Sequence, residues 1–108
     1  MLRAIERIAA KHAVRIGTFG HAGDGNLHPD LVLERGDPNG AAITKAVQED
    51  LYQAALDLGG TVTGEHGIGS ARVDWLEAQR GTDAVRVMRA IKAALDPQGL
   101  LNPGRVLS

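Results

Sequence analysis

The chain has 108 residues, no cysteine, and a formal net charge of −1 from 12 basic and 13 acidic side chains. This charge balance, without a basic cluster, argues against a protein that binds nucleic acid electrostatically. The absence of cysteine excludes disulfides, iron–sulfur clusters and thiolate zinc sites. No apolar run is long enough to span a membrane and the N-terminus does not resemble a signal peptide, so we expect one cytoplasmic domain.

The first half of the chain is expected to form a helix followed by a hairpin. Apolar residues at helical spacing predict a helix over residues 2–12. Alternating residues predict a strand over 14–20, and a second apolar run continues such a face from Leu27 to Leu33. Turn-forming residues lie between the two runs, so the strands should pair as an antiparallel hairpin.

The register of this hairpin follows from where it closes. If Gly23 and Asn26 form the closing pair, Ile16 faces Leu33. This pairing places an apolar side chain opposite an apolar one, which is favourable across two strands.

Helices are expected over most of the second half. Asp37-Pro38 is typical of an N-cap followed by a first-turn proline, and the helix that begins there should end at Gly59. A shorter helix is expected over residues 71–79. Thr82 can cap a last helix that ends near Asp96 because a proline follows. The residues of this helix expected to face inward are Val85, Met88, Ile91 and Leu95.

These elements predict an α+β fold, in which a helix layer packs on an antiparallel hairpin. A two-stranded hairpin is marginal alone, even with helices covering it. We therefore expect further strands from another copy or from a longer parent chain, and self-association follows from the first alternative.

Two histidines flank the glycine-rich turn. In the register above, His21 and His28 are direct cross-strand partners, with Cβ atoms about 4.5–5.5 Å apart. Two imidazoles on one face at that separation can chelate a divalent ion. The alternative is that both are polar residues at a solvated hairpin end.

A second candidate is the Glu65-His66 dipeptide. Neighbouring side chains in a regular strand point to opposite faces, but the flanking glycines permit a turn. A carboxylate added to two imidazoles would suit Zn²⁺, Mn²⁺ or Fe²⁺ with open positions for substrate. The other histidine would remain as a proton acceptor. Alternatively, the dipeptide is a turn with a solvated glutamate and histidine.

Three motifs that are rich in glycine follow one another along the chain. They are FGHAGDGNLHP at residues 19–29, GTVTGEHGIG at residues 60–69 and LDPQGLLNPGR at residues 95–105. In this order and spacing the chain resembles the C-terminal part of FAD-linked 2-hydroxy-acid oxidoreductases. This group includes the glycolate oxidase flavin subunit, D-lactate dehydrogenases and D-2-hydroxyglutarate dehydrogenases, within the vanillyl-alcohol-oxidase superfamily.

The resemblance implies a role for each candidate residue. His66 would be the base that takes the hydroxyl proton of the substrate as hydride leaves its α-carbon for the flavin. Asn26 and Asn102 would lie beside the FAD. The metal would hold the hydroxylate and carboxylate of the substrate as a Lewis acid. The implied ligands of this divalent metal (Zn, Mn or Fe) are His21, His28 and Glu65.

The resemblance also implies what surrounds this chain. Residues 1–108 would be a C-terminal cap and metal-site domain, with the hairpin as part of a ferredoxin-like cap sheet that is incomplete relative to the full family domain. Because the FAD-binding domain is absent, we expect the isolated chain neither to bind FAD tightly nor to turn over. The implied partners are a 2-hydroxy-acid substrate, an FAD-binding domain in cis or trans, and further copies of the chain. The alternative function is a non-catalytic metal-binding or subunit-interaction module.

Overall fold

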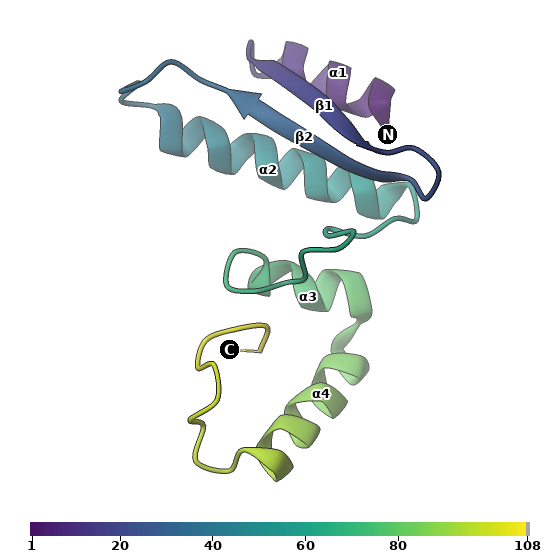
Figure 1. Ribbon diagram of the computed structural model, residues 1–108, viewed down its shortest axis with the longest axis vertical. Coiled ribbons are helices and arrows are strands. Elements are labelled where there is room, and N and C mark those ends of the chain that lie inside the picture. The colour runs from purple at the N-terminus through teal and green to yellow at the C-terminus, as the bar shows by residue number, and fades with distance from the viewer. Residues whose placement is uncertain (108) are drawn as a thin grey trace. The chain divides into compact units, whose positions relative to one another are not determined.

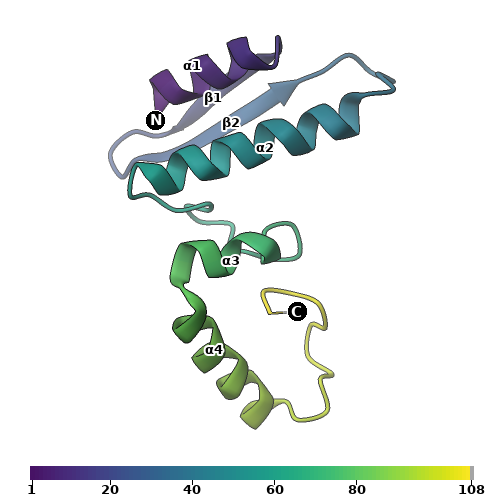
Figure 2. The same cartoon turned by 180° about the vertical axis from the view of Figure 1, so that it is seen from behind.

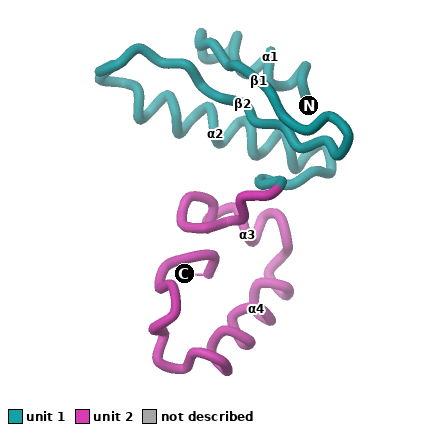
Figure 3. Tube along the Cα trace, viewed as in Figure 1, with its two compact units in different colours: residues 1–64 teal, residues 65–108 magenta. Residues whose placement is uncertain are grey.

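The computed structural model describes residues 1–107, and the chain divides into two compact units, residues 1–64 and residues 65–108 (Figure 3). The α+β class expected from the sequence is confirmed. None of the helices within the described residues is both long and apolar enough to cross a membrane. The elements in chain order are α1 (Leu2–Lys11), β1 (Arg15–His21), β2 (Asn26–Val32), α2 (Gly40–Asp57), α3 (Val73–Arg80) and α4 (Thr82–Leu95) (Figure 1).

The first unit has its core between two helices and one face of the β1–β2 hairpin. Both views of the chain show α1 and α2 running along the hairpin (Figures 1 and 2). Burying each aliphatic side chain of this core contributes about 1.5–3 kcal/mol. The buried cluster consists of Ile5 and Ile8 from α1 with Val47 and Leu51 from α2, and hairpin residues that include Ile16, Leu27 and Leu31 pack against it.

The hairpin register differs from the expected one by two residues. His21 pairs with Asn26, and Ile16 pairs with Leu31 rather than with Leu33. The reason is a loop of four residues instead of two. Within it the Asp24 N–H donates to the His21 carbonyl at 3.2 Å, and the Asp24 carboxylate accepts the Asn26 N–H at 3.0 Å. His21 and His28 are therefore diagonal neighbours, not the direct partners expected.

The N-terminus of α2 also lies later than expected. Asp37 does accept the Asn39 N–H at 2.8 Å, as an N-cap would, but the helix begins at Gly40. The Gly40 N–H donates to the Asp37 carbonyl at 3.0 Å, which closes a separate turn over residues 37–40. The other end agrees with expectation, since Gly59 adopts φ +74° directly after the Leu58 C-cap.

An ion-pair cluster joins α1 to α2. The Asp50 carboxylate accepts from Lys11 Nζ at 2.7 Å and from His12 Nε2 at 2.6 Å. The two hydrogen bonds lower the pKa of Asp50 below its ordinary value, and the bond from Lys11 has the larger effect. His12, which follows α1 directly, is therefore a structural residue of this helix pair.

In the second unit, α3 packs against α4 but covers only part of its length. Val85 is buried, but Ile91 and Leu95, which were expected to face inward, are 56% and 79% exposed. The difference follows from length, because α3 has 8 residues and α4 has 14. Thr82 is not the N-cap that was expected. That position belongs to Gly81 at φ +81°, and the Thr82 hydroxyl donates to Glu77 Oε1 at 2.7 Å.

Asp96 anchors the chain after α4. Its carboxylate accepts the backbone N–H groups of Leu100 and Leu101 at 2.9 Å each and is ion-paired with Lys92. Lys92 also donates to the Leu101 carbonyl at 2.8 Å. The bond from Lys92, followed by that from the Leu101 N–H, lowers the pKa of Asp96 to about 2. The helix ends where expected, and this carboxylate fixes the loop that leads to Asn102.

Candidate metal centre

Two histidines lie on the hairpin face opposite the helices. A shift of register by two residues leaves every side chain on its expected face, because side chains alternate with a period of two. His21 on β1 and His28 on β2 therefore still share one face. Their ring centroids are 5.5 Å apart and the rings meet edge to face at 85°. The imidazoles lie together as expected, although by a diagonal pairing.

The chain returns to this end of the hairpin at Gly64. A Cβ added there would lie only 2.6 Å from Cγ of Asn26 and nearer still to its Oδ1. The carboxamide of Asn26 thus occupies the space that a side chain at residue 64 would need. Glu65 follows by one peptide bond, so its Cα lies about 3.8 Å from that of Gly64. The close approach of Gly64 to Asn26 therefore fixes where Glu65 starts.

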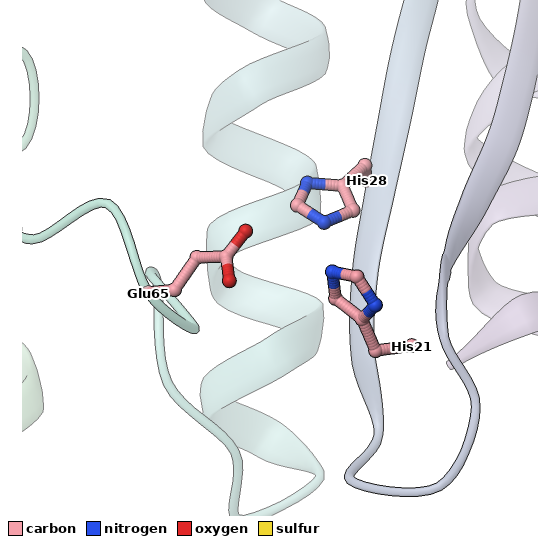
Figure 4. A group of neighbouring side chains, drawn as sticks. All are labelled: His21, His28 and Glu65. Carbon is pink, nitrogen blue, oxygen red and sulfur yellow. The ribbon is translucent and has the colours of Figure 1, made fainter.

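Figure 4 shows the resulting group of His21, His28 and Glu65. One ligand atom from each, two imidazole nitrogens and a carboxylate oxygen, lie within 4.8 Å of one another. Metal–ligand bonds of 2.0–2.2 Å in a tetrahedral site place the donor atoms about 3.4 Å apart. Small side-chain rotations would close this difference. Two imidazoles and one carboxylate are a donor set that fits Zn²⁺, Mn²⁺ or Fe²⁺ and leaves positions open.

His66 is exposed beside Glu65. The side chain is 66% exposed, and its Nε2 lies 3.5 Å from Glu65 Oε1. The segment bends here and is not a regular strand, with Gly67 at φ +76° and Gly69 at φ +56°. The alternation that would separate neighbouring side chains therefore does not apply, as the flanking glycines had suggested. An exposed imidazole at this position can receive a proton from a bound molecule.

The two asparagines expected beside a flavin belong to different units. Asn26 closes the hairpin, and its carboxamide packs against Gly64 as described above. Asn102 lies in the closing turn with φ +47°, a left-handed conformation that asparagine tolerates better than most residues. Its carbonyl accepts the Arg105 N–H at 3.2 Å. The amide side chains of both residues remain candidates for flavin contacts.

Sequence reasoning did not assign a role to Phe19. In the observed register Phe19 is the direct partner of His28, and the two rings stack with centroids 5.1 Å apart and planes inclined by 22°. Phe19 lies two positions before His21 on the same strand, so the alternation of side chains places both on the same face of the hairpin. Its partner could be found only with the correct register.

Comparison with known proteins places the whole chain in one group. Residues 1–106 match the family described as FAD linked oxidases, C-terminal domain. The chain is 41% identical to glycolate oxidase subunit GlcD of Bacillus subtilis (strain 168) over 108 residues, covering 100% of this chain and 23% of the relative. It is 44% identical over 88 residues to a probable mitochondrial D-lactate dehydrogenase of Danio rerio, covering 82% and 18%.

A third relative is a D-2-hydroxyglutarate dehydrogenase of Stutzerimonas stutzeri (strain A1501), 32% identical over 113 residues that cover 99% of this chain and 24% of the relative. The chain thus spans about a fifth to a quarter of the length of these relatives. The family match extends over nearly every residue, including all three motifs. The chain therefore belongs to the family of FAD-linked oxidase C-terminal domains.

Proposed function

We propose that residues 1–108 form the cap and metal-site domain of an FAD-dependent enzyme that oxidises a 2-hydroxy acid such as D-lactate or glycolate. The observation that carries this proposal is the donor set of His21, His28 and Glu65, whose ligand atoms lie within 4.8 Å of one another. It occurs in a chain whose relatives are named glycolate oxidase subunit, D-lactate dehydrogenase and D-2-hydroxyglutarate dehydrogenase.

In this proposal the two hairpin imidazoles and the Glu65 carboxylate hold a divalent ion, Zn²⁺, Mn²⁺ or Fe²⁺. When bound, a divalent ion would supply Lewis-acid polarisation of the substrate hydroxyl and carboxylate, and a flavin would supply the acceptor for hydride from the α-carbon. His66 accepts the hydroxyl proton, since its ring is exposed and adjoins the Glu65 ligand. Asn26 and Asn102 are the residues whose side-chain amides would contact the flavin.

The FAD-binding part of the enzyme is the partner that this account requires. The chain covers about a fifth to a quarter of its relatives, and an exposed apolar face of α4 supports a docking surface. Val87, Ile91 and Leu95 recur at four-residue spacing on α4 and are 50%, 56% and 79% exposed. We expect the chain by itself neither to bind FAD tightly nor to oxidise substrate.

Self-association is a further proposal about partners. The hairpin is the whole sheet within the described residues, so both of its edges are unpaired. Unpaired edges are templates for pairing with another strand. We expect light scattering to detect an oligomer whose share rises with concentration. A monomer at every concentration would contradict self-association without affecting the enzymatic proposal.

A chimera tests the proposed reaction. The C-terminal region of the Bacillus subtilis relative would be replaced by this chain, and oxidation of glycolate and D-lactate would be followed with an artificial electron-acceptor dye. We expect turnover that is lost in His66→Gln by about 100-fold or more, the scale of general-base catalysis. His12→Gln is the matched control, because His12 binds Asp50 in the helix pair.

Two results would contradict the proposal. One is a chimera that binds FAD, as its absorption spectrum shows, yet oxidises none of these acids. The other is a His66→Gln chimera as active as the parent. The His12→Gln chimera should keep its activity, so that the loss in His66→Gln is specific to the proposed base.

A further inference from the structure

The open face of the hairpin carries an aromatic side chain beside the proposed metal ligands. Phe19 is 62% exposed, although phenylalanine is among the residues most often buried. Its ring does not project alone into solvent. It stacks on His28 with a centroid distance of 5.1 Å and an interplanar angle of 22°.

The His28 ring therefore meets an aromatic ring on two sides. Phe19 lies nearly parallel to it, and His21 meets it edge to face with centroids 5.5 Å apart. The terminal torsion of a histidine side chain is broad and roughly two-fold, so an exposed imidazole has no strong preference for one plane. Stacking restricts this plane, because offset-stacked and edge-to-face arrangements of aromatic rings are favourable.

The plane of an imidazole decides where it can bind a metal, because the nitrogen lone pair lies in that plane. In metal sites the ring orientation is commonly fixed by groups behind the ligand, and loss of such a group weakens metal binding. We propose that Phe19 is a positioning residue of the metal site, whose stacking fixes the His28 imidazole in the plane from which its nitrogen faces the ion. This inference rests on the metal site of the proposed function.

A competing account assigns the exposed ring to packing against another part of a longer protein. The two accounts make different predictions for the 108-residue chain alone. If Phe19 served only to cover a distant surface, its replacement would leave metal affinity in this chain unchanged. If it orients His28, the affinity falls even though no other domain is present.

The test is the affinity of the chain for Co²⁺ and Zn²⁺, measured by Co²⁺ absorption and by Zn²⁺ competition, in Phe19→Leu and Phe19→Tyr. We expect Phe19→Leu to bind about 2- to 10-fold more weakly, which corresponds to one aromatic pair. Phe19→Tyr keeps the ring and should bind as the wild type does. Val32→Ala is the matched control, because Val32 is 48% exposed on the same face but pairs with Arg15.

A second readout needs no metal. A ring stacked at this distance shifts the His28 ring-proton resonances upfield, so Phe19→Leu should move them toward solvent values while Phe19→Tyr should not. Far-UV circular dichroism identifies a variant that has lost its fold. Adding His28→Ala should remove any further effect of Phe19→Leu on affinity, because the replaced ring acts through His28.

The outcomes separate this inference from the proposed function. If the wild-type chain binds metal and Phe19→Leu binds it with the same affinity, the role of Phe19 is overturned and the metal site stands. An affinity that falls equally in Val32→Ala, or that still falls in the His28→Ala background, also overturns it. A wild-type chain that binds neither ion overturns the metal site and this inference together.

Discussion

The substitution Gly64→Ala isolates the contact that brings Glu65 to the hairpin. The new Cβ would meet the Asn26 carboxamide, at 2.6 Å from Cγ and 3.1 Å from Nδ2. Carbon atoms in contact are normally 3.5–4.0 Å apart, so the two groups must separate by about 1 Å. Either Asn26 changes rotamer or residue 64 withdraws, and the second movement carries Glu65 with it.

The magnitude follows from the tolerance of metal sites. Ligand distances in such sites vary by only about 0.2 Å, so a further displacement of about 1 Å adds to the movement that Glu65 must make to reach the ion. We expect the Zn²⁺ affinity to fall roughly 10- to 100-fold, the range seen when the groups that support a ligand are lost. The fold itself should be retained with a cost of about 1–3 kcal/mol for overpacking.

The assay is Zn²⁺ competition, with circular dichroism to confirm folding. Gly23→Ala is the control, because a Cβ there meets no atom within 4 Å. Asn26→Ala removes every carboxamide atom that the new Cβ would meet, so Asn26→Ala/Gly64→Ala should bind more tightly than Gly64→Ala. Glu65→Gln should weaken binding similarly, and combining it with Gly64→Ala should add little. A folded Gly64→Ala chain that binds Zn²⁺ like the wild type would refute the reasoning.

Two further predictions concern the carboxylates that hold each unit. Asp50→Asn should lower the free energy of unfolding by about 1 kcal/mol near pH 7, as urea denaturation can measure. The pKa of Asp50 is lower in the folded state than its value of 3.8 in the unfolded chain, so the carboxylate stabilises the fold above pH 3.8 and loses this effect as the pH falls further. A stability difference between wild type and Asp50→Asn that persists unchanged at pH 2 would contradict this. Asp96→Asn should accelerate amide hydrogen exchange at Leu100 and Leu101, whereas the exposed Asp83→Asn should not. With a pKa of about 2, the Asp96 contribution should disappear between about pH 4 and pH 2, and equal exchange in wild type and Asp96→Asn at pH 6 would exclude the proposed anchoring.

Much of the histidine face could be predicted from the sequence, although the pairing within it could not. The hydrophobic alternation indicates which residues face the core, and that assignment survives a shift of two residues. Both registers place a leucine opposite Ile16, so the pairing of apolar side chains does not decide between a turn of two residues and one of four. The observed turn of four residues has the hydrogen bonds of Asp24. The diagonal contact of His21 with His28 and the stacking of Phe19 follow only from the observed register.

Local sequence patterns could not predict the contacts between distant segments. The glycines around Glu65 indicated a bend, but they could not indicate that Gly64 packs against the Asn26 carboxamide. The helical periodicity of α4 indicated an apolar stripe without showing what covers it. The shorter α3 leaves Ile91 and Leu95 exposed. A pattern reports which side chains are apolar, whereas burial depends on the size of the neighbouring element.

The most direct measurement is the metal content of the chain purified without chelators, by elemental analysis, beside that of the His21→Ala/His28→Ala variant. The account predicts about one Zn, Mn or Fe per wild-type chain, as expected for one site of two imidazoles and a carboxylate, and none in the double variant. Equal metal in both proteins, or metal in neither, would contradict it.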